Sequence, residues 1–591
     1  MSGTPISVTI DGTTVTVAEG TMLIDAAHEA GVDIPRLCYT QDLEPLGTCG
    51  MCMVQIEGIP DYKRACITEA QNGMKVLTNT AELRKIKRGL LELILAAHPE
   101  DCLKCIKHGK CELQELADRM EVRTLRFDQY THGLPVDSSA AGIMRDMNKC
   151  IGCGRCISVC HDVQSVKAID FQLRGSETIV SPGHDATMGT STCVNCGQCV
   201  VYCPVGALYE KELIETVWDE IGNPQRTVVA QIAPAVRVAL GEEFGMEPGT
   251  LVIGKIYAAL KKLGIDTVFD TNFSADLTIM EEGTELLHRI QKGGPLPLIT
   301  SCSPGWIKFG ETFFPDLIDN LSSCKSPQQM LGALIKTCYA KSKNLDPASI
   351  VSLSIMPCTA KKYESARPEM NASGFRDVDY VLTTRELARM IRQAGIDFSR
   401  LDEIPADPML SGYSGAGTIF GATGGVMEAA LRTAYELQTG KTLDAIEFES
   451  VRGLDGVKRA SVHLDGTEVR VAVASGLGNA RELMMEVEKA RRSGELPYHF
   501  IEIMACTGGC VGGGGQPLRN GMEERTRRIE GLYTEDKNRT IRKSHENPEV
   551  LGLYREFLKE PGSDIAHSLL HTHYRDRSGR IDEIPAKERV S

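Results

Sequence analysis

Long apolar runs and export signals are both missing from the sequence. No run of 18 or more consecutive apolar residues occurs, so no membrane-spanning helix is expected. The N-terminus, MSGTPISVTIDG, has neither a basic segment followed by an apolar stretch nor a twin arginine. This predicts a cytoplasmic protein, unless it is exported with a signal-bearing partner. Basic residues are too few for a nucleic-acid-binding protein, since 65 Lys and Arg against 79 Asp and Glu give a net charge of −14.

Nucleotide-binding motifs are missing too. The glycine run at 512–515 is not followed by the Lys-Ser/Thr of a P-loop, and close backbone approach to a cluster is its better interpretation. Gly476-Leu-Gly478 lacks the third glycine of a Rossmann fingerprint. Any flavin or NAD(P) is therefore expected on another polypeptide.

Cysteine, in contrast, is abundant. The chain has 21 cysteines in 591 residues, a length that predicts several domains. In a large chain without an export signal, cysteines should be thiols, and tight spacing between them indicates metal binding.

Residues 1–80 begin like a small β-sheet domain. Alternating apolar residues and an Asp11-Gly12 turn predict a hairpin with strands near 6–10 and 14–17, followed by a helix over about 21–30. Four cysteines follow in a glycine-containing loop, spaced C-x10-C-x2-C-x13-C: Cys38, Cys49, Cys52 and Cys66. Four thiolates suit a [2Fe–2S] cluster, with a tetrahedral zinc site as the alternative.

Residues 81–125 begin with a helical pattern over 83–95. Four metal-binding side chains then follow with the spacing H-x3-C-x2-C-x5-C: His98, Cys102, Cys105 and Cys111. A [4Fe–4S] cluster with one histidine ligand and a zinc site with three cysteines both fit this composition. A neutral imidazole ligand would leave a cluster less negative and raise its potential.

Residues 138–212 carry the most specific spacing, C-x2-C-x2-C-x3-C, twice. This is the two-cluster ferredoxin pattern, in which the fourth cysteine of each run binds the other cluster. One [4Fe–4S] cluster should use Cys150, Cys153, Cys156 and Cys203, and the other Cys193, Cys196, Cys199 and Cys160.

From about residue 225, strands alternate with amphipathic helices, which predicts an α/β domain. The candidate buried strands cover residues 227–232, 296–300, 350–355, 469–474 and 498–503. Three of them run directly into cysteine-bearing loops, and strand ends are where α/β folds place functional groups.

Those three loops resemble the signatures of [FeFe] hydrogenases, TSCCPxW, MPCxxKxxE and ExMxCxxGCxxGGGxP. Here they read TSCSPGW at 300–306, MPCTAKKYE at 356–364 and EIMACTGGCVGGGGQP at 502–517, and FGATGGVME at 420–428 is also similar to the family. The resemblance covers essentially residues 1–570, in the order of the long, multi-cluster members. The two N-terminal cysteine patterns also resemble those of the cluster-rich subunit of respiratory complex I.

The resemblance implies a multidomain α+β and α/β chain. A β-grasp [2Fe–2S] ferredoxin domain (1–80), a [4Fe–4S] domain with one histidine and three cysteine ligands (81–125) and a bacterial two-[4Fe–4S] ferredoxin domain (138–212) would come first. A two-lobed hydrogenase domain (225–565) and a C-terminal tail (566–591) would follow. The charged part of the tail, from about residue 575, is expected either to dock a partner or to be mobile.

The resemblance also implies the H-cluster, a [4Fe–4S] cluster bridged by a cysteine to a two-iron unit with CO, cyanide and a bridging dithiolate amine. Cys358, Cys506 and Cys510 would bind the [4Fe–4S] part, and Cys510 would supply the bridge. Lys361 would contact a cyanide through a charge-assisted hydrogen bond. Core packing is the alternative for the expected cavity residues: Pro234, Ser326, Met356, Phe420 and Met504.

One position departs from the family pattern. Ser303 stands where the family has a second cysteine, a cluster ligand. Ser303 could bind as an alkoxide, or Cys302 or Cys324 could take its place. A thiol is the softer and more acidic ligand, which favours a cysteine. TSCSP resembles the loop of the soluble, NAD(P)-linked branch of the family.

A proton relay is implied at Cys302, Glu282, Ser322 and Glu285, with Arg289 near the outer carboxylate. A thiol with an ordinary pKa of about 8.5 is mostly protonated at neutral pH and can pass protons in either direction. The alternative for the two glutamates is an ordinary solvated helix face.

The function implied is reversible H2 oxidation and proton reduction by the catalytic subunit of a hydrogenase. Electrons would pass along one [2Fe–2S] and three [4Fe–4S] accessory clusters to complex I-like partners that bind flavin and NAD(P), to ferredoxin, or to both, as in electron-bifurcating complexes. Hydrogenase maturation proteins are further expected partners. A wiring scaffold without catalysis, a sensory or degenerate hydrogenase-like protein and an iron–sulfur carrier are the alternatives.

Overall fold

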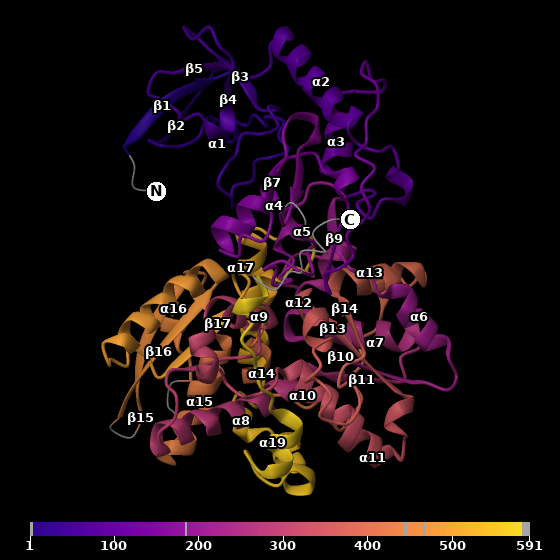
Figure 1. Cartoon of the computed structure of the whole chain (residues 1–591), viewed down its shortest axis with the longest axis vertical. Coiled ribbons are helices and arrows are strands. Elements are labelled where there is room, and N and C mark those ends of the chain that lie inside the picture. Colours follow the sequence, from indigo (N-terminus) through magenta and orange to yellow (C-terminus); the bar gives the residue numbers. More distant parts are fainter. Residues whose placement is uncertain (1–3, 184–185, 443–445, 465–466, 582–591) are drawn as a thin grey trace.

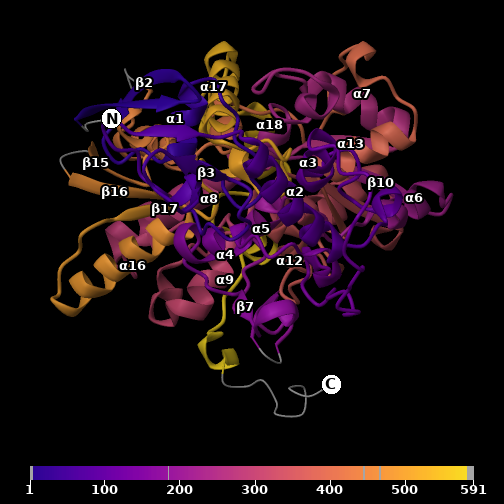
Figure 2. The ribbon, with the colours of Figure 1, turned by 90° about the horizontal axis from the view of Figure 1, so that it is seen from above.

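The computed structural model describes residues 4–183, 186–442, 446–464 and 467–581. In Figure 1 the N-terminal domains lie above a larger body made of two lobes, and Figure 2 shows the same chain from above. Within the described residues, no helix is long and apolar enough to cross a membrane.

The N-terminal domain is built on the predicted hairpin. β1 (Pro5–Ile10) pairs antiparallel with β2 (Thr13–Ala18) in the register Ile10 to Thr13. The helix α1 (Leu23–Glu29) follows, and Gly31 leaves it at a φ of +76°, which glycine adopts without strain. The sheet order is β2-β1-β5-β3-β4, completed by β3 (Met53–Ile56), β4 (Lys63–Arg64) and β5 (Lys75–Leu77).

The next two segments are short and rich in loops. The predicted helix is α2 (Ala81–Ala96), and α3 (Glu112–Arg119) follows the next cysteine pattern. In the ferredoxin-like segment, the helices α4 (Arg155–Ser158) and α5 (Gln198–Tyr202) occupy equivalent places in the two cysteine runs. Two small antiparallel pairs complete it: β6 (Ile143–Arg145) with β9 (Leu208–Glu210), and β7 (Asp170–Gln172) with β8 (Ile179–Ser181).

One lobe contains a fully parallel sheet of order β11-β10-β13-β14. Its strands are β10 (Thr227–Ile232), β11 (Thr267–Asp270), β13 (Ile350–Met356) and β14 (Tyr380–Thr383). Around it lie α6 (Ile214–Gly222), α7 (Ile253–Leu263), α10 (Pro327–Leu334), α11 (Ala340–Lys343), α12 (Ala360–Ser365) and α13 (Thr384–Gln393). The near-continuous apolar runs of β10 and β13 are typical of strands buried on both faces.

The other lobe has the sheet order β12-β17-β16-β15, with only β15 antiparallel. Its strands are β12 (Leu298–Ile299), β15 (Val457–Leu464), β16 (Thr467–Ser475) and β17 (Phe500–Met504). Its helices are α8 (Thr271–Lys292), α9 (Pro304–Phe313), α14 (Gly415–Ile419), α15 (Gly425–Thr439) and α16 (Leu477–Arg492). The strand predicted at 296–300 is shorter than expected, since Pro297 has no N–H for a ladder bond.

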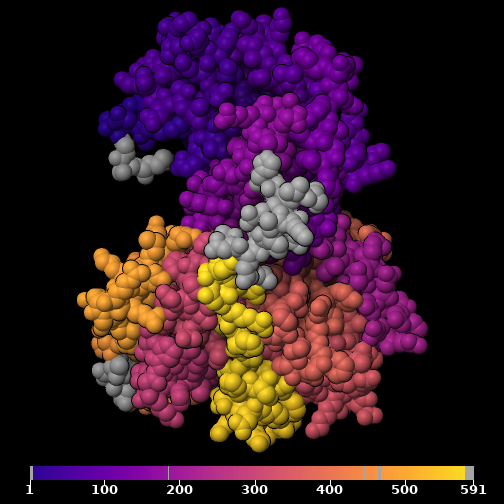
Figure 3. Space-filling view, in the orientation of Figure 1, coloured from indigo at the N-terminus to yellow at the C-terminus, as the bar shows by residue number. Residues whose placement is uncertain are grey.

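The C-terminal segment lies between the two lobes. Its helices are α17 (Met522–Asn538), α18 (Pro548–Leu553) and α19 (Asp564–Leu570), and Figure 3 shows this yellow band running down between the lobes. Residue 566, the expected start of a tail, lies inside α19, and Arg577 Nε still donates to Glu311 at 2.7 Å. Residues 582–591 of the expected tail lie outside the described residues.

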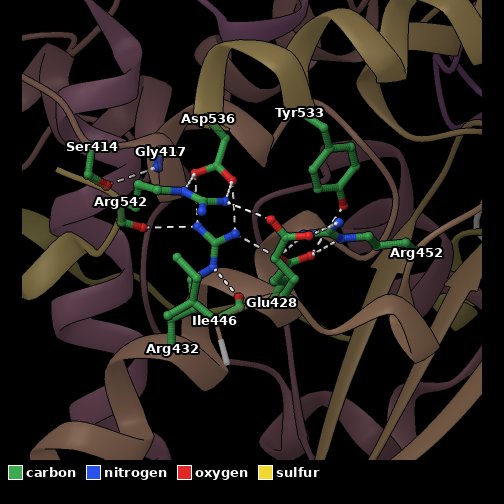
Figure 4. A network of polar contacts seen from close by, with 10 residues as sticks. Ser414, Gly417, Glu428, Arg432, Ile446, Arg452, Tyr533, Asp536 and Arg542 are labelled. Carbon is green, nitrogen blue, oxygen red and sulfur yellow. Dashed lines mark hydrogen bonds and ion pairs between the residues drawn. The ribbon is translucent and has the colours of Figure 1, made fainter. Parts of the chain in front are cut away.

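A buried ion network holds α17 in place (Figure 4). Arg432 of α15 is fully buried and pairs with Glu428 at 2.6 Å and with Asp536 of α17 at 3.0 Å. Arg542 and Arg452 complete the network around the two carboxylates. Because each buried charge has an opposite partner, the C-terminal segment is fixed to the lobe on which it packs.

Candidate active site

Four strands from the two sheets end at one cavity. Ala233 and Pro234 follow β10, Met356 ends β13, and Met504 ends β17, while the loop after β12 contributes Cys302. Carboxyl ends of strands therefore form the site, as is usual in α/β folds. The cavity also contains most of the residues that sequence reasoning placed there: Pro234, Cys302, Ser303, Met356, Cys358, Lys361, Phe420, Met504, Cys506 and Cys510.

Three cysteines of the cavity have the chemistry of a cluster-binding set. Burial, with the neighbouring Cys358 as a second cause, raises the pKa of Cys506 to about 12, and burial likewise raises the pKa of Cys510 to about 12. Burial also raises the pKa of Cys358. Without a bound cation these side chains are held as thiols, whereas a bound iron cluster would deprotonate them. The donors thus fit an iron–sulfur group.

Lys361 brings a positive charge to the cavity wall. Its Nζ donates to the Cys302 carbonyl oxygen at 3.1 Å and to Glu364 Oε2 at 2.9 Å. Ser326 Oγ donates to the same carboxylate oxygen at 2.9 Å. Ser326 is not among the cavity-lining residues, so the structure places it behind Lys361, and Glu364 joins the two.

Only two of the three candidates for the fourth ligand line the cavity. Cys302 and Ser303 both line the cavity, and Ser303 Oγ accepts a hydrogen bond from the backbone N–H of Ala505 at 3.3 Å. Cys324 is not a cavity-lining residue; its Sγ lies 3.9 Å from Glu285 Oε2. The geometry therefore removes Cys324 from the choice.

The expected relay residues are contiguous. Glu282 is 2 % exposed and lies on α8, one turn from Glu285. Burial raises the pKa of Glu282 to about 8, and the neighbouring Ser322 hydroxyl partly opposes this rise. Ser322 Oγ also donates to Glu285 Oε2 at 3.1 Å, and Arg289 donates to Glu285 Oε1 at 2.6 Å.

Cys302 stands at the inner end of this series. Burial raises the pKa of its thiol, and the charge of the Glu282 carboxylate is the second cause. The structure thus brings all five expected relay residues together.

The accessory cysteines gather in the expected sets. One small cavity is lined by Cys150, Cys153, Cys156 and Cys203, and another by Cys160, Cys193, Cys196 and Cys199. In the N-terminal domain, Cys52 Sγ and Cys66 Sγ are 3.4 Å apart, and Cys38 contacts both Cys49 and Cys66. Each set has the donors for one cluster.

His98 lies with its Nδ1 buried and without a hydrogen-bond partner among the described residues. Burial lowers its pKa, which keeps the imidazole neutral as a metal ligand requires. Within the described chain, neither of the two His/Cys/Asp/Glu groups compact enough for a single ion includes His98 or its neighbouring cysteines. A [4Fe–4S] cluster and a zinc site therefore both still fit the donors of this set.

Sequence reasoning missed two features of the site. Cys196, assigned to an accessory cluster, also lines the cavity beside Cys506. Glu502 is fully buried with a pKa raised by burial to about 7, and it accepts hydrogen bonds from the N–H groups of Gly424 and Met427 at the start of α15. The first residue of the third signature loop was the available signal for Glu502.

Known proteins are similar to this chain along nearly its whole length. Residues 226–514 match the family model "Iron only hydrogenase large subunit, C-terminal domain", and residues 522–577 match "Iron hydrogenase small subunit". Residues 3–81 match a 2Fe-2S iron-sulfur cluster binding domain, residues 87–126 an NADH-ubiquinone oxidoreductase-G iron-sulfur binding region, and residues 149–207 a 4Fe-4S dicluster domain.

Individual relatives extend the similarity. The chain is 48% identical to the NADP-reducing hydrogenase subunit HndD of Solidesulfovibrio fructosivorans, covering 96% of this chain and 98% of the relative. It is 39% identical to iron hydrogenase 1 of Clostridium pasteurianum, covering 96% and 100%. A solved apo [FeFe]-hydrogenase HydA1 from Chlamydomonas reinhardtii aligns with a TM-score of 0.55 at 42% identity, over 62% of this chain and 99% of that one.

Proposed function

The chain belongs to the iron-only, or [FeFe], hydrogenase family and is an oxidoreductase that acts on H2, and from this premise we propose its cofactors, proton path and electron partners. The observation that supports the proposal best is the cavity at which four strand ends bring Cys358, Cys506 and Cys510 together beside Lys361.

The H-cluster would occupy this cavity. When bound, it supplies the low-valent iron at which H2 is split or formed. Cys358, Cys506 and Cys510 would hold its [4Fe–4S] part, and Cys510 would also serve the two-iron unit. Lys361, oriented by Glu364, offers an ammonium to an anionic ligand of that unit, and Met356, Met504, Pro234 and Phe420 exclude water from it.

In this proposal Ser303 is the fourth ligand of the [4Fe–4S] part of the H-cluster, and Cys302 is a proton-transfer residue. Ser303 Oγ lies against the backbone N–H of Ala505, which precedes Cys506, whereas the thiol of Cys302 is a neighbour of Glu282. This revises the preference for a cysteine that ligand chemistry alone suggests. Ser303→Cys should preserve the [4Fe–4S] part and shift its potential, whereas Ser303→Ala should give an altered cluster signal in electron paramagnetic resonance. An unchanged signal in both variants would contradict the assignment.

Protons would pass from Cys302 through Glu282 and Ser322 to Glu285. A carboxyl with a pKa of about 8 gains and loses a proton readily near neutral pH, as a two-way relay needs. Ser322 joins the two glutamates by accepting from one and donating to the other. Arg289 fixes the outer carboxylate.

The electron path would use one [2Fe–2S] and three [4Fe–4S] accessory clusters. Cys38, Cys49, Cys52 and Cys66 would bind the first, and His98, Cys102, Cys105 and Cys111 the second. The two crosswise cysteine sets of residues 138–212 would bind the remaining pair. Metal analysis should find iron and no stoichiometric zinc; zinc at the His98 set would remove one cluster from the path.

The electron partners would be complex I-like subunits that bind flavin and NAD(P), with ferredoxin as a further partner, in a cytoplasmic complex. Support comes from HndD, a subunit of an NADP-reducing hydrogenase, and from the match of residues 87–126 to a region named for NADH-ubiquinone oxidoreductase. Hydrogenase maturation proteins would assemble the two-iron unit.

Purification from the native host tests the partner proposal. The expected result is co-purification of flavin-containing subunits and H2-dependent reduction of NAD(P), alone or coupled to ferredoxin. A monomeric chain that is fully active with ferredoxin alone would contradict the complex. It would leave the hydrogenase assignment intact.

A further inference from the structure

The outer end of the proposed relay is closed by Arg289. Besides Glu285 Oε1, its guanidinium donates to the carbonyl oxygens of Pro295 at 2.8 Å and Leu321 at 3.0 Å. A guanidinium has no acceptor atom and is not deprotonated in proteins. Arg289 can therefore orient Glu285 but cannot take its proton, and the proton must leave by another group.

The second carboxylate oxygen of Glu285 faces the C-terminal segment. Ser323 Oγ lies 3.3 Å from Glu285 Oε2 and 2.8 Å from His571 Nδ1, so one hydroxyl contacts both groups. His571 directly follows α19, and its backbone pairs with that of Cys324. This pairing fixes the imidazole beside the relay.

We infer that His571 is the proton carrier beyond Glu285, reached through Ser323. Glu285 gives its proton to Ser323 Oγ while the proton of Ser323 moves to His571 Nδ1, and the reverse transfers serve proton reduction. A hydroxyl that both donates and accepts makes this exchange possible without any net charge on the serine. The inference rests on the proposed relay and extends it by two residues.

The other ring nitrogen of His571 contacts a second carboxylate. Its Nε2 lies 3.1 Å from Glu281 Oε2, a buried carboxylate oxygen that also accepts from the Gly562 N–H at 2.8 Å. The Tyr554 hydroxyl donates to Glu281 Oε1 at 2.6 Å. Among the described residues, the titratable groups Glu281, Glu285, Cys324 and His567 lie beside the ring, and Tyr554 contacts Glu281.

His567 lies between His571 and solvent. Its ring stacks on that of His571 with centroids 4.7 Å apart, and it is exposed at the surface of α19. The inner imidazole is thus one ring away from water. The proton exit would thus be completed by the C-terminal segment, residues 522–577, which match a family model of their own.

The test compares His571→Gln and Ser323→Ala with wild type in the cluster-loaded enzyme, with His573→Gln as the matched control. His573 is an exposed histidine two residues away. Both relay variants should lower H2 oxidation roughly tenfold or more and enlarge the solvent deuterium isotope effect, because proton transfer becomes limiting. The control should match wild type. In His571→Ala, added imidazole should restore a measurable part of the rate.

Wild-type rates and isotope effects in both His571→Gln and Ser323→Ala would overturn the inference, and so would a loss in His571→Ala that imidazole does not restore. Glu282→Gln, measured in parallel, separates a failure of the proposed His571 exit from a failure of the relay itself. If Glu282→Gln is inactive while the His571 and Ser323 variants are normal, the relay stands and only this exit is wrong. If all three are normal, the proposed relay fails as well.

Discussion

Cys196 of the ferredoxin-like segment and Cys506 of the catalytic lobes line the same cavity, although 310 residues separate them in the sequence. The contact depends on glycines, since a Cβ added at Gly514 would lie 2.7 Å from the Cα of Gly197. The glycine run at 512–515 thus approaches the backbone that carries an accessory-cluster cysteine. The wall of the cavity that electrons would leave therefore contains Cys196, a residue expected to bind an accessory cluster.

Gly514→Ala should separate these two surfaces and slow electron transfer out of the active site. H2-dependent reduction of an external acceptor should fall several-fold, while H2/D+ exchange, which needs no accessory cluster, should be retained. Gly552→Ala is the control, because a Cβ there meets nothing within 4 Å. Equal loss of both activities would show instead that the active site itself is damaged.

Glu282→Gln should lower turnover by a factor of roughly 10² to 10⁴, the usual contribution of a positioned proton-transfer group. A glutamine keeps the hydrogen bonds with Ser322 but cannot carry a proton. Iron content and the CO and cyanide infrared bands should match those of wild type. Near-normal H2 oxidation in this variant would mean that protons travel elsewhere.

The same residue should affect the pH dependence of stability. The pKa of Glu282 is raised from 4.5 to about 8 in the folded state. Its stabilising contribution to the free energy of unfolding is therefore complete below about pH 4.5 and is lost as the pH rises to about 8. Over this window wild type should lose stability relative to Glu282→Gln, by up to ~1.4 kcal/mol per pH unit. Unfolding midpoints of both proteins at about pH 5, 6.5 and 8 check this. Parallel midpoints would contradict it.

Arg432→Met should destabilise the fold strongly. The substitution removes the fully buried positive charge that pairs with Glu428 and Asp536. Removing one partner of a buried ion pair lowers the free energy of unfolding by about 3–5 kcal/mol in comparable sites. Arg527→Met is the control, since Arg527 is 45 % exposed in its pairs with Glu247 and Glu523, and such pairs contribute about 0–1 kcal/mol. The denaturant concentration at the midpoint of unfolding should fall for Arg432→Met and stay unchanged for Arg527→Met. Equal midpoints would mean that the network does not anchor the C-terminal segment.

Local spacing in the sequence was sufficient to predict much of this protein. The hairpin around Asp11 follows from period-two alternation and a turn, and the crosswise cysteine sets follow from the repeated C-x2-C-x2-C-x3-C pattern of two-cluster ferredoxins. Five candidate strands were placed from apolar runs, whereas β11, β14 and β15 were missed. The four-residue runs of β11 and β14 are too short to be distinguished from the ends of neighbouring helices.

Long-range contacts account for what sequence reasoning did not find. Cys324 was a candidate cluster ligand by its residue type, but the pairing of its backbone with His571 places it beside Glu285. His571 itself contacts a hydroxyl 248 positions away, and no local pattern signals such a contact. The resemblance implied a tail from residue 566, yet that residue lies inside α19, which packs between the lobes.

Infrared spectroscopy of the cluster-loaded enzyme tests the central claim most directly. The account predicts CO and cyanide stretching bands that shift when H2 replaces an inert gas, with H2/D+ exchange in the same sample. An enzyme that contains its full set of iron–sulfur clusters, yet shows neither those bands nor exchange, would contradict it.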